Sequence, residues 1–183
     1  MLFRSEPPVS ALESDPEYRV AVIDLIGVLA YGELTAFERL AADAALAPTI
    51  DDKAALAGMA TAEYRHFQIL RERLAALGVD PQSAMEPFRS ALDGFHAHTA
   101  PSDWLEGLVK AYVGDGIATD FYREISAVLD PESRALVLEV CSDTGHSNFA
   151  VATVRAAIEA DPRVGGRLAL WGRRLVGEAI SQA

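Results

Sequence analysis

The residues of this chain best suited to chemistry are a carboxylate and an imidazole three positions apart, Glu63 and His66. Side chains three residues apart leave an α-helix on the same face, and that face is otherwise apolar, with Met59, Phe67 and Leu70 beside the pair. Burying both groups costs on the order of several kcal/mol unless a partner compensates them. A first-row metal ion is such a partner, because carboxylate oxygens and neutral imidazole nitrogens are its ordinary ligands. The pair alone is common on helices, so its meaning depends on matching ligands elsewhere.

Matching residues recur in the second half of the chain, where a second helical hairpin resembles the first. Gly32-Glu33-Leu34 has its counterpart in Gly114-Asp115-Gly116, and Glu63-x-x-His66 has its counterpart in Asp143-x-x-His146. Glu33 and Asp115 each lie on an apolar helical stripe, so we expect both to face inward, which unliganded acidic residues rarely do. The alternative is a set of buried polar residues that are satisfied by one another and by water. The expected metal ligands are Glu33, Glu63, His66, Asp115, Asp143 and His146.

The composition indicates one globular, helical domain. The chain has 183 residues, of which 50% are hydrophobic, and this length is sufficient for a single core. Alanine and leucine dominate while alternating runs of β-branched residues are scarce, which favours an all-α fold. The net charge of −11 argues against a large sequence-independent nucleic-acid surface, which needs clustered Lys and Arg. Because Cys141 is the only cysteine, an intrachain disulfide and a cysteine-based metal site are excluded.

The sequence predicts a cytoplasmic protein with no membrane partner. Residues Met1 to Ala11 contain no apolar stretch, so no signal peptide is evident. The longest apolar run extends from Val20 to Leu34. It is interrupted by Asp24 and Glu33 and is shorter than a membrane span requires.

Asp-Pro pairs mark the expected starts of helices, because each places an N-cap before a proline in the first turn. A flexible tail is expected at residues 1–14 and a single domain at 15–183. Short loops make antiparallel hairpins of the first and second, and of the third and fourth, long helices. Residues 78–100 form a long crossover with one or two short helices, which gives a four-helix bundle with a fifth, C-terminal helix. The long helices are expected at about 16–46, 49–77, 101–129, 131–160 and from 162 onward.

This combination of bundle and ligands resembles the ferritin-like di-iron carboxylate proteins, which place two lone Glu and two Glu-x-x-His motifs in a bundle core. The resemblance covers residues 16–160 and implies two bound iron ions, or manganese, together with dioxygen and an external electron donor. Histidine on both the second and the fourth helix is more similar to oxygenases, bacterioferritins and rubrerythrins than to storage ferritins. Through Ala30-Tyr31-Gly32-Glu33-Leu34 and Tyr112-Val113-Gly114-Asp115-Gly116, the chain is similar to actinobacterial relatives of the bacterial tRNA methylthio-isopentenyl-adenosine hydroxylase.

The chain departs from that family pattern in its second half, where Asp115 and Asp143 replace glutamates. Because aspartate is shorter by one methylene, its helices must come closer to reach the same ions. Gly114, Gly116 and Gly145 flank the two aspartates, at a cost of about 1 kcal/mol each in a helix interior, and would permit that approach. The same glycines also fit a relative that has lost its metal.

Two further features have simpler interpretations. His96 and His98 form a His-x-His that we expect to be a surface feature of the crossover, because no carboxylate cluster completes a site there. The stripe of Arg167, Arg173 and Arg174 is interpreted as binding phosphate or pairing with the acidic body. Trp171 beside it either covers the bundle or forms part of a homodimer face on the C-terminal helix.

The expected function is that of a di-iron oxygenase or hydroxylase with an unknown organic substrate. tRNA is a candidate substrate that the acidic net charge disfavours. A ferroxidase or peroxide-scavenging protein is the alternative enzyme. A metal-free helical scaffold that acts through its surface is the alternative outside enzymes. Bound metal separates the first two from the third, and a pocket for an organic molecule separates the oxygenase from the ferroxidase.

Overall fold

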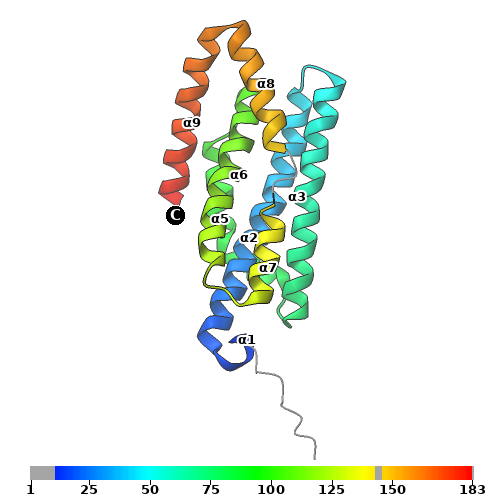
Figure 1. The fold of residues 1–183 in the computed structure, drawn as a ribbon, viewed down its shortest axis with the longest axis vertical. Coiled ribbons are helices and arrows are strands. Elements are labelled where there is room, and N and C mark those ends of the chain that lie inside the picture. Colours follow the sequence, from blue (N-terminus) through cyan, green and yellow to red (C-terminus); the bar gives the residue numbers. More distant parts are fainter. Residues whose placement is uncertain (1–10, 143–145, 183) are drawn as a thin grey trace, which may run out of the picture.

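The computed structural model describes residues 11–142 and 146–182, and every regular element in these ranges is a helix (Figure 1). The predicted all-α bundle is therefore confirmed. The short segments η1 and η2 are single turns of 3₁₀-helix. The elements in chain order are α1 (Ala11–Ser14), α2 (Pro16–Asp43), η1 (Ala44–Leu46), α3 (Ile50–Ala76), α4 (Pro81–Met85), η2 (Glu86–Phe88), α5 (Arg89–His98), α6 (Trp104–Ser126), α7 (Pro131–Val140), α8 (His146–Ala160) and α9 (Pro162–Gln182).

Local capping chemistry explains where most of these helices begin. The Asp15 carboxylate accepts hydrogen bonds from the backbone N–H of Glu17 and Tyr18 at the start of α2. Asp80 and Asp130 cap α4 and α7 in the same way, and each precedes a proline. These bonds satisfy N–H groups that a helix leaves without partners in its first turn. The Asp-Pro pairs thus mark helix starts as predicted.

The long helices form two antiparallel hairpins joined by a long crossover (Figure 1). α2 and α3 run in opposite directions and pack closely along their lengths. α4, η2 and α5 then return the chain to the other end of the bundle, so that α6 starts there. α7 and α8 run antiparallel to α6, and α9 lies outside the bundle against α5, α6 and α8. This is the predicted connectivity with its fifth helix.

The predicted helix at 131–160 is wrong as a single element, because α7 ends at Val140 and α8 begins at His146. The last turn of α7 closes with a hydrogen bond from Cys141 N–H to the Val137 carbonyl, and the Ser142 hydroxyl donates to the Glu139 carbonyl at 2.7 Å. Residues 142–145 are Ser, Asp, Thr and Gly. Residues of these four types have low helix propensity, so the sequence here does not favour a continuous helix.

Smaller differences concern the ends of the chain and the crossover. The expected tail ends in the helical turn α1, whose Leu12 is buried in the core. The crossover contains three helical segments where one or two were expected. The third long helix begins at Trp104, where the Asp103 carboxylate caps it, and not at residue 101.

The core has two clusters, one at each end of the bundle, and α2 contributes to both. Near the α1 end, Ile26, Leu70 and Val137 are almost fully buried. Near the other end, Leu56 and Leu108 have no exposed surface. The site described below lies between the two clusters.

Within the described residues, one helical stretch, 16–46, is long and apolar enough to cross a membrane by length and composition. It exceeds the run seen in the sequence because the helix extends beyond both Val20 and Leu34. This stretch is the central helix of the bundle and packs against α3, α4, α5 and α6. Burial in a protein core gives a helix the same apolar composition.

Candidate metal centre

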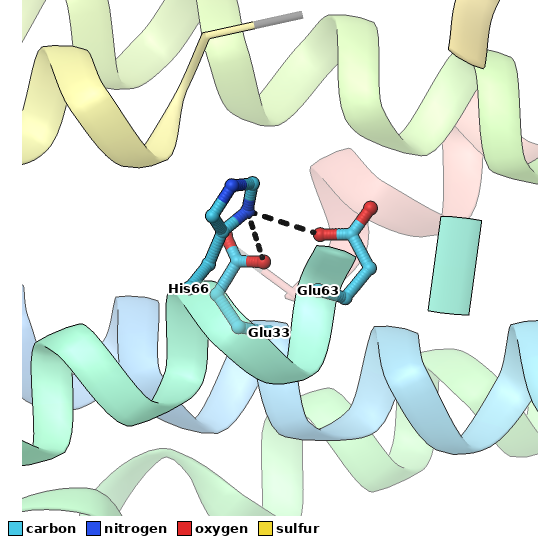
Figure 2. Close-up of side chains that lie close together, drawn as sticks. All are labelled: Glu33, Glu63 and His66. Atoms are coloured by element: carbon cyan, nitrogen blue, oxygen red, sulfur yellow. Dashed lines mark ion pairs between the residues drawn. The ribbon is translucent and has the colours of Figure 1, made fainter. Parts of the chain in front are cut away.

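Three of the predicted ligands converge between α2 and α3 (Figure 2). Glu33 extends from α2, and Glu63 and His66 extend from one face of α3. The Nδ1 atom of His66 lies 3.5 Å from Oε2 of Glu33 and 3.5 Å from Oε2 of Glu63. Each residue offers one ligand atom, and these three atoms all lie within 4.8 Å of one another. The i, i+3 spacing on α3 and the hairpin pairing of α2 with α3 create this cluster.

The cluster has the polar atoms and the spacing that a metal ion needs. Oε2 of Glu33 and Nδ1 of His66 are buried and have no hydrogen-bond partner among the described residues. A charge-assisted hydrogen bond would measure about 2.7–2.9 Å, so the 3.5 Å contacts are too long to satisfy these atoms. Two ligands that each lie about 2.1 Å from a shared ion are separated by about 3.0–3.4 Å, depending on geometry. The three side chains therefore fit a shared cation better than they fit one another.

Electrostatics at the cluster point the same way. Burial raises the pKa of the Glu33 carboxyl well above its ordinary value, and the neighbouring Glu63 adds to the rise. The pKa of His66 is raised to about 10, first by Glu33 and then by Glu63, although burial opposes the shift. Without a metal the cluster therefore holds protons at neutral pH. A divalent cation takes the place of those protons, because metal ligands must be deprotonated.

A cavity of about 240 Å³ adjoins the three residues, and Asp115 borders it from α6. The expectation that Glu33 faces inward is met, since its side chain is 16% exposed. Asp115 lines the same cavity but is exposed, and the Thr119 hydroxyl lies 3.4 Å from its Oδ1. The predicted close helix approach at Gly114 and Gly116 is wrong, because a Cβ at either position would meet nothing within 4 Å. α6 thus leaves room where the sequence suggested tight contact.

The remaining two predicted ligands lie where the structure gives no side-chain placement. Asp143 falls outside the described residues, and His146 is the first residue of α8 with its side chain undescribed. The ligands assigned to the second half of the centre stay a prediction.

The cavity also has a second polar end that the sequence did not reveal. His96, expected on the surface, is partly buried, and its Nε2 lies 3.1 Å from the Thr35 hydroxyl. Lys110 is only 6% exposed and borders the same cavity. One signal was available: His96 follows Leu92 and Phe95 at helical spacing, which places it on the apolar face of α5. His98 is exposed as expected, and its Nδ1 lies 2.7 Å from Oε1 of Glu178.

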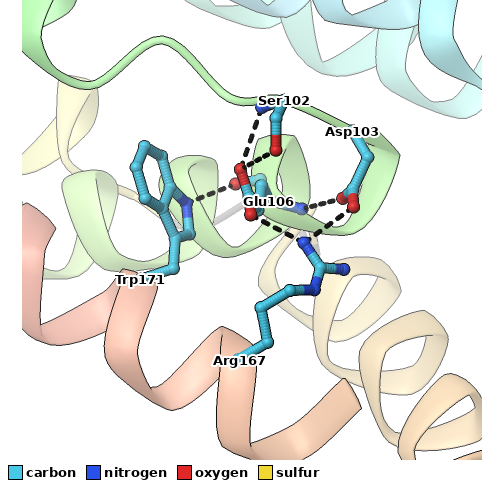
Figure 3. Close-up of polar contacts among 5 residues, drawn as sticks. All are labelled: Ser102, Asp103, Glu106, Arg167 and Trp171. Carbon is cyan, nitrogen blue, oxygen red and sulfur yellow. Dashed lines mark hydrogen bonds and ion pairs between the residues drawn. The ribbon is translucent and has the colours of Figure 1, made fainter. Parts of the chain in front are cut away.

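Of the predicted arginine stripe on α9, Arg167 pairs with the acidic body (Figure 3), whereas Arg174 donates to the His98 carbonyl at 2.7 Å. Nη1 of Arg167 donates to Oε1 of Glu106 at 2.6 Å and to Oδ2 of Asp103 at 2.7 Å. The Trp171 indole donates to the Glu106 carbonyl at 2.9 Å and is 8% exposed. Trp171 therefore covers the start of α6, which was one of the two roles expected of it. The other face of α9 leaves Leu170 67% exposed.

Comparison with known proteins supports the fold at the level of a family. A family model for the ferritin-like domain of actinomycetes matches residues 16–183, which span α2 to α9. No curated protein matches the sequence. The ferritin-like resemblance is thereby confirmed, and the relationship to the tRNA hydroxylase stays a prediction.

Proposed function

The chain belongs to the ferritin-like domain family of actinomycetes, and from that premise we propose that it is a non-haem di-iron protein that activates dioxygen. The observation that carries the proposal is the cluster of Glu33, Glu63 and His66. Two of its buried polar atoms lack hydrogen bonds to the described residues and are spaced to share a cation. Members of the fold include both enzymes and proteins without catalytic activity, so the proposal rests on the cluster as well as on the family.

The proposed ligands divide between the two hairpins. Glu33, Glu63 and His66 hold one ion. Asp115 reaches the same cavity from α6, and with Asp143 and His146 it holds the second. Carboxylate-rich sites with one imidazole per ion suit iron, and also manganese. When bound, two neighbouring iron ions supply the electrons with which dioxygen is reduced.

The protein's own residues bind and orient these ions and limit access to them. The His66 ring, which must lose its proton to bind a metal, faces two carboxylates, whose negative charges favour a cation at that point. Apolar side chains line much of the adjoining wall, among them Leu29, Met59 and Leu92. They keep bulk water away from one side of the cluster and leave space for an apolar group.

This space favours an oxygenase over a ferroxidase. A cavity of about 240 Å³ beside the cluster is small for a drug-sized site but admits a compact organic molecule. A ferroxidase or peroxide-scavenging protein needs no such space. The metal-free scaffold is disfavoured because it would leave Oε2 of Glu33 and Nδ1 of His66 buried without a hydrogen bond to any described residue.

The finer parts of the proposal concern substrate and context. The net charge of −11 disfavours tRNA as the substrate, so we favour a small organic molecule over a modified nucleoside. The electron donor is a separate protein or cofactor, and the protein acts in the cytoplasm. Exposed Leu170, Val176 and Ile180 on α9 supply a face for a homodimer.

Elemental analysis of protein purified without chelator tests the proposal. The expected metal content is about two ions per chain, mostly iron, falling by at least one in Glu63→Gln. Glu72→Gln is the matched control, because Glu72 lies on the same helix but is exposed. Equal metal content in the two variants would refute the site. Comparison of hypermodified nucleosides in cells with and without the gene tests the substrate. Loss of a hydroxylated nucleoside from cells without the gene would identify tRNA as the substrate after all.

A further inference from the structure

Lys110 is a buried cation at the wall of the same cavity. Lys110 is 6% exposed. Its Nζ atom donates a hydrogen bond to the Thr99 carbonyl at 2.8 Å and lies 5.6 Å from the centre of the Phe95 ring. An ammonium carries three N–H donors. Among the described residues the Thr99 carbonyl is the only hydrogen-bond acceptor of Nζ, and no carboxylate lies within 4.0 Å of it. Lys110 therefore has donor capacity left for a ligand.

The groups around Lys110 leave this end of the cavity positive. Arg39 and Asp43 border it from α2, and Arg39 lies 3.6 Å from Oε2 of Glu38. His96 is neutral: burial, then Lys110 and Arg39, lower its pKa to about 4. Thr35 donates its hydroxyl hydrogen to the Gly32 carbonyl, so the His96 ring donates to the Thr35 oxygen from Nε2. The Lys110 charge is felt by Asp43 but forms no ion pair with a described carboxylate, and a single such charge suits a monoanion better than a phosphate dianion.

The cavity connects this positive end to the metal cluster. Lys110 and Asp115 both line it and are five residues apart on α6, which corresponds to about 7.5 Å along the helix. The wall between is mainly apolar, with Ala36, Phe95 and Ala111 among its residues. An extended chain covers about 3.5 Å in three bonds, so a chain of about six bonds, or about seven atoms, spans the 7.5 Å between these two positions. At about 30 Å³ per heavy atom, the 240 Å³ cavity holds a ligand of about eight heavy atoms.

We propose that this cavity binds a small aliphatic carboxylate, with its anionic group on Lys110 and its chain directed toward Glu33 and His66. Hexanoate, with six carbons and two oxygens, matches both the length and the volume. Exposed Arg39 and Tyr112 on the lining give the ligand an entry from solvent. That such an anion is the substrate rests on the function proposed above, whereas its binding at Lys110 does not require a metal.

Calorimetric titration of the metal-free, full-length protein with hexanoate tests the binding. Lys110→Gln keeps a donor for the Thr99 carbonyl but removes the charge, so it preserves the fold better than Lys110→Met. We expect Lys110→Gln to weaken hexanoate binding by about tenfold or more, as for loss of a charge-assisted hydrogen bond. Lys53 is the only other lysine and is exposed on α3, so Lys53→Gln should bind hexanoate normally. Hexan-1-ol lacks the carboxylate charge. Its affinity for the wild-type chain should therefore be no higher than the affinity of hexanoate for Lys110→Gln.

A second measurement uses the wild-type chain alone. Mass spectrometry after limited acetylation should show that hexanoate protects Lys110 and leaves Lys53 equally reactive. No detectable binding, equal binding of hexanoate and hexan-1-ol, or unchanged binding in Lys110→Gln would overturn the inference. Binding that requires added iron and is independent of Lys110 would also overturn it, because the carboxylate would then be a metal ligand. If hexanoate binds the metal-free chain through Lys110 but the chain takes up no iron, the carboxylate site stands and the oxygenase proposal fails.

Discussion

Metal uptake at the Glu33, Glu63 and His66 cluster should displace protons well above the usual histidine range. The pKa of His66 in the metal-free protein is about 10, so at pH 7 the imidazole lies about 3 pH units below it and is protonated. Removing that proton costs about 4 kcal/mol at 1.36 kcal/mol per unit. The metal affinity should therefore rise about tenfold per pH unit from pH 7 toward 9. An ordinary histidine, with a pKa near 6.5, would give almost no slope in that interval.

Calorimetry with Mn²⁺ under anaerobic conditions measures this slope, and repeating it in buffers of different ionisation enthalpy counts the protons released. We expect at least one proton per ion at the cluster. Glu33→Gln removes the largest cause of the raised His66 pKa and should flatten the slope as well as weaken binding. His98→Asn, at an exposed imidazole, is the control and should leave the slope unchanged. A wild-type affinity that is independent of pH above 7.5 would refute the electrostatic argument.

The raised pKa of His66 also determines how the stability of the metal-free protein changes with pH. A histidine whose folded-state pKa is raised stabilises the fold fully below its unfolded value, near 6.5, and loses that contribution as pH rises through about 10. Metal-free protein should therefore lose stability between pH 7 and 10, and His66→Asn should reduce that loss. Chemical denaturation at several pH values measures it, and an unchanged pH dependence in His66→Asn would contradict the assignment.

Three other predictions concern packing and stoichiometry. Gly27→Ala should destabilise the fold by about 1–3 kcal/mol, because a Cβ there would clash with the Ala84 carbonyl oxygen of α4. Gly32→Ala on the same helix should stabilise the fold by up to about 1 kcal/mol, because a Cβ there meets nothing within 4 Å. Equal denaturation midpoints for the two variants would contradict this prediction. Trp171→Phe should cost about 1 kcal/mol through loss of its hydrogen bond to α6, and an unchanged midpoint would show that this bond contributes nothing. In metal titrations, Asp143→Ala should keep the ion bound by Glu63, whereas Glu63→Ala should lose it. Loss of all metal from Asp143→Ala alone would show that the second hairpin binds metal more strongly than the first.

Helix boundaries were predictable where a short-range interaction sets them. Asp15 and Asp130 cap α2 and α7 with their own side chains, and Gly78 ends α3 with a positive φ of 74° that glycine adopts at little cost. The break between α7 and α8 was missed because the Asp143-x-x-His146 spacing was interpreted as a motif on one continuous helix. The run from Ser142 to Gly145 carried the signal, in four consecutive residues of low helix propensity.

Half of the candidate centre followed from spacing, and the other half depends on tertiary distance. Glu63 and His66 share a face of α3 by helical geometry, and the α2–α3 hairpin brings Glu33 to them. The exposure of Asp115 depends on how far α6 stands from that hairpin, which its own sequence does not encode locally. Lys110 was missed for the same reason, because its surroundings come from the crossover helix α5.

We infer that Glu33, Glu63 and His66 share a metal ion. Crystals grown anaerobically with Fe²⁺ and measured on both sides of the iron absorption edge test it most directly. We expect an anomalous peak about 2.1 Å from Nδ1 of His66 and from one oxygen of each glutamate. We also expect a second peak bordered by Asp115. Absence of any peak at the cluster, with the imidazole hydrogen-bonded directly to the two carboxylates, would contradict the account.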